Sequence, residues 1–119
     1  MYKLINPTEN ARTLTQAVLQ ISEMLGFYHA ELARILGLQC NDIGDLANAK
    51  TVLHEGTPAW QQAVLFICLY QTLFDKFDGD GPTMCNWLRR NDPSLGGEPL
   101  LMMVDQGKLV EVLDHIRQF

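Results

Sequence analysis

Histidine and cysteine, the residues that most often bind metals or act as nucleophiles, are few and widely separated in this chain. The six are Cys40, Cys68, Cys85, His29, His54 and His115. Zinc sites usually take pairs of ligands from closely spaced residues, and no such pair occurs here. The cysteines also lack the CxxC spacing of redox centres and are odd in number. We therefore predict no metal site and a reducing, cytoplasmic environment.

The acidic segment 75–81 could be taken for a calcium-binding loop, but its spacing is wrong. With Gly81 at the sixth position of an EF-hand loop, Lys76 occupies the first position and Trp87 the last. Both positions require an oxygen ligand, normally a carboxylate. We interpret the segment as the end of a helix, with carboxylates that face solvent.

Catalytic patterns are also missing from the sequence. His115 follows Asp114, but neither has a serine or cysteine nearby in an arrangement typical of nucleophilic catalysis. The nucleophile elbow, the P-loop, the Rossmann glycine pattern and the His-Glu-x-x-His motif do not occur. We therefore predict a protein that is not an enzyme and that binds no cofactor.

Size and composition indicate one acidic globular domain. The chain has 119 residues, of which 47% are hydrophobic and 19% are charged. Nine basic residues against fourteen acidic ones give a net charge of -5, which disfavours non-specific binding to nucleic acid. The apolar run 63–70 is too short to span a membrane, and residues 1–14 lack the apolar core of a signal peptide. We expect a cytoplasmic protein with no membrane segment.

The spacing of apolar residues is helical through most of the chain, and no stretch alternates as a strand does. After an extended start that ends near Pro7, we predict helices over 14–25, 29–36, 41–48, 58–77, a short stretch after Thr83, a stretch from Pro99, and 109–116. Asn41, Thr57 and Thr83 are the predicted N-caps. The helix 58–77 is apolar over most of its circumference, which predicts the buried centre of the fold. The predicted fold is an all-α, compact bundle of about six or seven helices.

Residues 29–48 have the pattern of a helix-turn-helix unit. Ala33 is small where the two helices would cross, Gly37 lies at the turn, and Leu32, Ile43 and Leu46 supply apolar contacts. This unit would form an N-terminal subdomain over residues 1–56. Residues 57–119 would add the long helix and a C-terminal subdomain, so that both parts make one compact domain.

The second helix of this unit is poorly suited to DNA. It carries Asp42 and Asp45 and no basic residue before position 50, and carboxylates are repelled by phosphates. The residues that could still contact bases or phosphates are Gln39, Asn41, Asn48 and Lys50. DNA binding is therefore an alternative that electrostatics disfavours.

The C-terminal third contains the most specific pattern in the sequence. It consists of Trp87-Leu88, Pro93, Leu95-Gly96-Gly97, Pro99-Leu100, Gly107 and the amphipathic stretch 110–116. In physical terms this is an apolar anchor, a turn with two glycines and a helix that starts at a proline. The pattern resembles the toxin-binding domain of the Xre/MbcA/ParS antitoxin family. The upstream helix-turn-helix pattern and the long helix 58–77 are also similar to this family.

The resemblance implies an antitoxin of a type II toxin–antitoxin pair, a homodimer that obstructs the active site of a RES-type, NAD-consuming toxin. The implied toxin-binding residues are Trp87, Arg89, Arg90, Leu95, Gly96, Gly97, Lys108, Asp114, Arg117 and Phe119. Trp87 could instead be wholly buried in the core. If Arg89 and Arg90 are exposed contacts, replacing both should leave the melting temperature nearly unchanged. The alternatives are a helix-turn-helix transcriptional regulator that represses its own gene, or an adaptor that binds another protein.

Overall fold

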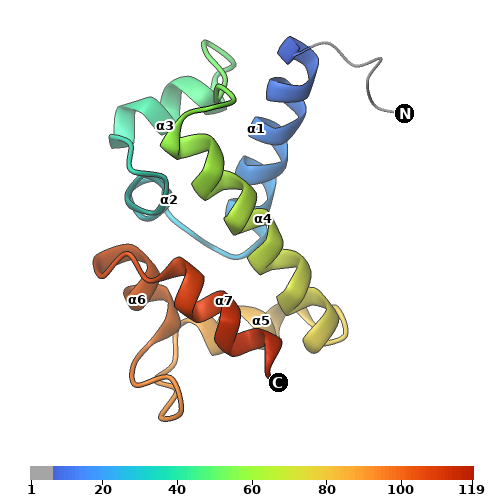
Figure 1. The fold of residues 1–119 in the computed structure, drawn as a ribbon, viewed down its shortest axis with the longest axis vertical. Helices are drawn as coiled ribbons and strands as arrows, with labels where there is room; N and C mark the ends of the chain where they lie inside the picture. The colour runs from blue at the N-terminus through green and yellow to red at the C-terminus, as the bar shows by residue number, and fades with distance from the viewer. Residues whose placement is uncertain (1–6) are drawn as a thin grey trace.

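The structure, a computed structural model, describes residues 7–119 and is all-α over that range (Figure 1). The predicted extended start before Pro7 lies outside the described residues. The helices are α1 (Pro7–Met24), α2 (His29–Leu36), α3 (Cys40–Ala47), α4 (Pro58–Lys76), α5 (Gly81–Leu88), α6 (Pro99–Asp105) and α7 (Leu109–Arg117). The bundle of seven helices within residues 7–119 confirms the predicted fold class. No helix in the described range is both long and apolar enough to cross a bilayer.

The sequence signals that start and stop helices account for most of the helix ends. Gly37 follows α2 in the left-handed conformation, with φ of 76°, which other residues adopt at a cost. The Thr57 hydroxyl accepts a hydrogen bond from the Trp60 backbone N–H at 3.2 Å, and Pro58 begins α4. Thr57 is therefore the N-cap that the sequence predicts.

Two predicted N-caps are wrong. Helix α3 begins at Cys40, so Asn41 lies in its first turn and the N-cap is Gln39. The Asp42 carboxylate accepts a hydrogen bond from the Gln39 N–H at 2.9 Å. Helix α5 is capped by Asp80, whose carboxylate accepts from both the backbone N–H and the hydroxyl of Thr83. In both helices a carboxylate accepts a hydrogen bond from a backbone N–H of the first turn, because the N-terminus of a helix is positively polarised.

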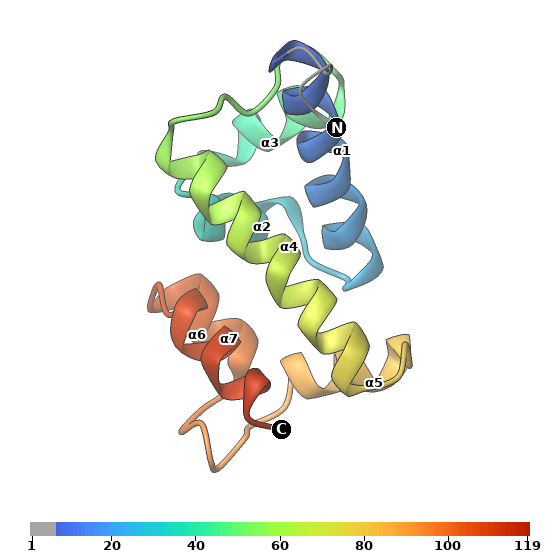
Figure 2. The same ribbon diagram turned by 45° about the vertical axis from the view of Figure 1, so that its right-hand side comes forward.

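Helix α4 runs through the middle of the bundle and contacts α1, α2, α5 and α7 (Figure 2). Its Ala63, Phe66, Leu69 and Leu73 are fully buried and form the centre of the core. The prediction that this helix is the buried centre of the fold is therefore confirmed, although Gln61, Val64, Gln71 and Phe74 on its other side are exposed. Packing four helices against one cylinder still leaves a side of that cylinder uncovered.

One continuous core crosses the boundary between residues 1–56 and 57–119. Helix α2 packs against α3, and also against α4 and α6 from the second part. The Arg34 guanidinium links α2 to α6, because it lies 3.5 Å from Asp105 and donates to the Val104 carbonyl oxygen at 3.3 Å. The helix-turn-helix-like unit is thus continuous with the C-terminal helices. Its ability to bind DNA stays a prediction.

Candidate partner-binding surface

The turn 92–97 between α5 and α6 is organised by the backbone of Asp92. The Asp92 N–H donates to the Gly97 carbonyl oxygen at 2.9 Å. The Asp92 carbonyl oxygen accepts from the N–H groups of Leu95, Gly96 and Gly97. Gly96 has φ of 92°, a conformation that favours glycine. These bonds hold the Leu95-Gly96-Gly97 part of the motif in one defined shape.

The Asp92 side chain connects this turn to α5 and α7. Its carboxylate accepts hydrogen bonds from the Trp87 indole N–H at 3.1 Å and from the Ser94 N–H at 2.9 Å, and it lies 3.4 Å from His115 Nε2. Burial acts most strongly on this carboxyl group and raises its pKa. The hydrogen bonds from Trp87, Ser94 and Leu95 together outweigh burial, so the pKa of Asp92 lies below its usual value. Asp92 is therefore held as a carboxylate that fixes the turn.

An aromatic cluster, made of Phe77, Trp87, His115 and Phe119, covers the same end of the molecule. The Phe119 ring packs edge-on against Trp87 at 5.5 Å, against His115 at 5.5 Å and against Phe77 at 5.9 Å between centroids. Edge-to-face packing at such distances is the preferred geometry of aromatic pairs. Phe119 nevertheless remains 49% exposed. The cluster thus joins α4, α5 and α7 and offers an apolar edge to solvent.

Trp87 is half-buried, so it is not a wholly buried core residue. Its outer edge lines a hollow of about 330 Å³ together with Phe77, Thr83, Asn86 and Arg90. Arg90 is exposed beside this hollow. An aromatic wall next to a guanidinium can accept an apolar or acidic group from a partner protein.

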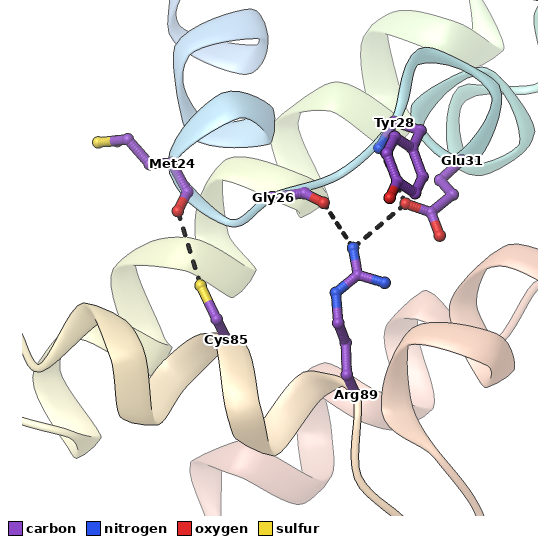
Figure 3. A network of polar contacts seen from close by, with 6 residues as sticks. All are labelled: Met24, Gly26, Tyr28, Glu31, Cys85 and Arg89. Carbon is purple, nitrogen blue, oxygen red and sulfur yellow. Dashed lines mark hydrogen bonds and ion pairs between the residues drawn. The ribbon is translucent and has the colours of Figure 1, made fainter.

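The Arg89 side chain points toward the segment between α1 and α2 (Figure 3). Its guanidinium donates to the Gly26 carbonyl oxygen and lies 3.3 Å from the Glu31 carboxylate, which ties the end of α5 to the segment between α1 and α2. Nearby, the Cys85 thiol donates to the Met24 carbonyl oxygen at 3.6 Å. Arg89 is thus bound within the chain although its side chain is 37% exposed, and its part in partner contact stays a prediction.

The remaining predicted residues lie along α7. Asp114 and Arg117 form an exposed ion pair at 3.4 Å. Lys108 directly precedes α7, and a helix of nine residues separates it from Arg117 by about 13 Å along the helix axis. The structure therefore brings Trp87, Arg90 and Phe119 together. Asp114 and Arg117 lie on the exposed side of α7, and Lys108 precedes the first residue of this helix.

Sequence reasoning missed Asp92 and His115 as the residues that hold this region together. An aspartate directly before Pro93-Ser94 is typical of a turn in which the carboxylate accepts a hydrogen bond from the backbone N–H two residues later in the chain. That signal was available for Asp92. The approach of His115 has no local signal, because it depends on how α7 packs against the turn.

The residues proposed for DNA lie around α3. Gln39, Asn41, Asn48 and Lys50 are all exposed, and Asp42 and Asp45 on the same helix are half-buried. Within the described residues, no group of three or more His, Cys, Asp or Glu side chains is placed to bind a metal ion. Comparison of the sequence with known protein families and with curated proteins found no match.

Proposed function

We propose that this protein is an antitoxin that inhibits a RES-type, NAD-consuming toxin through the surface formed by the aromatic cluster, Arg90 and α7. The observation that carries the proposal is the anchoring of the Leu95-Gly96-Gly97 turn to Trp87 and α7 by Asp92. A turn held in this way is preorganised, and preorganisation lowers the entropy cost of binding. Trp87 and the Leu95-Gly96-Gly97 turn belong to the pattern that resembles the family, and Asp92 holds them together.

The chemistry of the surface suits an active site that binds NAD. Such a site must attract the anionic pyrophosphate of the dinucleotide, so its entrance carries cationic or N–H donor groups. The exposed Asp114 carboxylate can exchange its ion pair with Arg117 for those groups, and the half-exposed Phe119 ring offers apolar contact. Arg90 and Arg117 can pair with acidic residues around the entrance. Obstruction of this kind requires no chemistry from the antitoxin itself.

Coexpression with the RES-type toxin encoded next to it tests this function. We expect growth and cellular NAD to be preserved by the wild-type protein, and to fall with Arg90→Glu. Arg12→Glu is the matched control, because Arg12 is an exposed arginine on α1, away from this surface. Toxicity that persists with the wild-type protein would refute the proposal. Copurification of a stoichiometric partner other than a toxin would indicate the adaptor alternative.

A DNA-binding regulator is the second candidate function. The observation that favours it is the exposure of Gln39, Asn41, Asn48 and Lys50 around α3. Binding of this kind predicts a titration with DNA from upstream of the gene that weakens as salt rises, since phosphate contacts release counterions. A flat titration at low salt would exclude it, and loss of binding in Lys50→Ala would support it.

A further inference from the structure

A hollow of about 510 Å³ lies between α1 and the stretch 46–54, which ends α3 and leads toward α4. We call it the α1 hollow, because residues 12–19 of α1 form one of its walls. Sites for small molecules are commonly hollows of about 300–1,000 Å³. The start of α1 and the segment after α3 lie at the opposite end of the molecule from the C-terminus (Figure 1). The α1 hollow is therefore separate from the proposed partner-binding surface.

All ionisable side chains that line the α1 hollow are basic. They are Arg12, Lys50 and His54, and no aspartate or glutamate of the described residues lines it. The chain as a whole has fourteen acidic residues against nine lysines and arginines, so this lining departs from its composition. Neither Arg12 nor Lys50 belongs to any ion pair within residues 7–119. Their charges are therefore available to an anion from outside the chain.

The end of α3 has a backbone conformation that brings Lys50 to the hollow. Ala49 has φ of 60°, a left-handed conformation that residues other than glycine adopt at a cost. The Lys50 N–H donates to the Asp45 carbonyl oxygen at 2.9 Å, which closes the end of the helix. Ala49 and Lys50 both line the hollow. Backbone strain of this kind is concentrated at binding sites in proteins.

Thr15 holds the other side of the hollow together. Its buried hydroxyl donates to the Ala11 carbonyl oxygen at 2.7 Å and accepts from the Leu53 N–H at 2.9 Å. Leu53 is buried at this contact, and His54 follows it directly. On α1, Arg12 lies one turn before Thr15. The anchor thus brings Arg12 and His54 to the same hollow, although they are far apart in the sequence.

The lining suits a small molecule that carries a phosphate monoester on an apolar body. A phosphate monoester has about 1.5 to 2 negative charges at neutral pH, which matches the two charges of Arg12 and Lys50. A carboxylate would match only one of them. Guanidinium groups bind phosphate oxygens in pairs, and ammonium groups attract them as point charges. Leu19, Leu46 and Val52 are buried or half-buried and supply the apolar contact for the rest of the ligand.

DNA matches the α1 hollow less well than a small molecule does. Of the four residues considered above for DNA, only Lys50 lines the hollow. Gln39, Asn41 and Asn48 lie outside this lining. Each phosphodiester of DNA carries a single negative charge, and its neighbours along the strand would need cations beyond the hollow as well.

We propose that the α1 hollow binds a small organic phosphate monoester. Arg12 and Lys50 hold the phosphate, His54 lies beside it, and Leu46 contacts the apolar body of the ligand. The proposal rests on α1 and on the segment after α3. It neither assumes nor requires toxin binding by the C-terminal surface.

An NMR titration of the isotope-labelled protein with phenyl phosphate tests the site. We expect saturating changes in the amide signals of residues 12–19 and 46–54, with a dissociation constant in the low millimolar range for so small a ligand. Phenol, which lacks the phosphate, should cause no such change, and benzoate should bind more weakly than phenyl phosphate. No saturating change with phenyl phosphate, or equal binding of benzoate, would overturn the proposal.

Two variants and a matched control assign the binding to the named cations. Lys50→Gln and Arg12→Gln should each weaken phenyl phosphate binding by about fivefold or more, because each removes one charged hydrogen bond to the phosphate. Lys76→Gln is the control, since it removes the same charge from an exposed lysine at the far end of α4. Equal affinity of Lys50→Gln and Lys76→Gln would overturn the assignment.

Competition with a short DNA duplex separates a small molecule from nucleic acid as the natural source of the phosphate. Under the proposal, the duplex does not displace phenyl phosphate from the α1 hollow at physiological salt. Displacement by the duplex at lower concentrations than those of phenyl phosphate would show that the cations serve DNA, and would overturn the proposal of a small-molecule site.

Discussion

Replacing Arg89 by alanine should destabilise the protein, whereas replacing its neighbour Arg90 should not. Arg89 joins α5 to the segment between α1 and α2 through the Gly26 carbonyl oxygen and the Glu31 carboxylate. Arg90 is exposed and lies beside the aromatic cluster instead. The two residues are adjacent in sequence and identical in type, so each is the natural control for the other.

The size of the effect follows from the two interactions of the Arg89 side chain. A hydrogen bond from a charged group contributes about 1.5–3 kcal/mol when buried, and roughly half of that remains for a side chain that is 37% exposed. The ion pair with Glu31 adds at most about 1 kcal/mol, since exposed pairs are weak. Arg89→Ala should thus lose about 1–2 kcal/mol. For a domain of this size, that loss lowers the melting temperature by about 4–8 °C.

Thermal unfolding followed by circular dichroism measures both variants under the same conditions. Arg90→Ala should change the stability by less than about 0.5 kcal/mol, as for other exposed residues. A double-mutant cycle of Arg89→Ala with Glu31→Gln should give a coupling of about 0.5–1 kcal/mol. Equal melting of the two arginine variants would refute the assignment of Arg89 to the fold and return it to the partner surface.

Three further predictions concern the backbone and Asp92. The pKa of Asp92 is lowered in the folded protein, so the stabilisation from its carboxylate is complete above the ordinary aspartate pKa. This stabilisation is lost as the pH falls through the lowered pKa of the folded protein. The free energy of unfolding should therefore depend less on pH in Asp92→Asn than in the wild type between about pH 5 and 2. Gly96→Ala should lower the free energy of unfolding by about 1–2 kcal/mol, because φ is 92° at this residue. Gly97→Ala is the control, because Gly97 has an ordinary φ, and it should change this free energy little. Urea unfolding measures both variants. Ala49 has φ of 60° after α3, so Ala49→Gly should stabilise the protein by about 0.5 kcal/mol. Ala47→Gly, at the last residue of α3, should instead destabilise it. The opposite order of melting temperatures would contradict this.

Local patterns predicted the helices well because each helix is encoded in a short stretch of sequence. The range 29–36 is that of α2, and Thr57-Pro58 begins α4 as predicted. The cap at Asp80 was missed because threonine and aspartate both cap helices well, and only the observed start at Gly81 decides between them.

Local sequence patterns could not predict contacts between residues that are far apart in the chain. Nothing near Arg89 in the sequence shows that Gly26 and Glu31 lie within its reach, since they are about sixty residues away. The uncharged run from 58 to 74 indicates burial, but it does not say whether another helix or another molecule supplies the cover. The exposure of Val64 and Phe74 on α4 became visible only when the positions of the other helices were known.

Isolation of the tagged protein from its native host, followed by identification of the copurifying partner, tests the central claim most directly. The proposed function predicts a stoichiometric partner that consumes NAD only after separation from the antitoxin. It also predicts that Arg90→Glu reduces recovery of this partner while Arg12→Glu does not. Recovery of the protein without a partner, or of a partner that is inactive toward NAD when freed, would contradict inhibition of a NAD-consuming toxin.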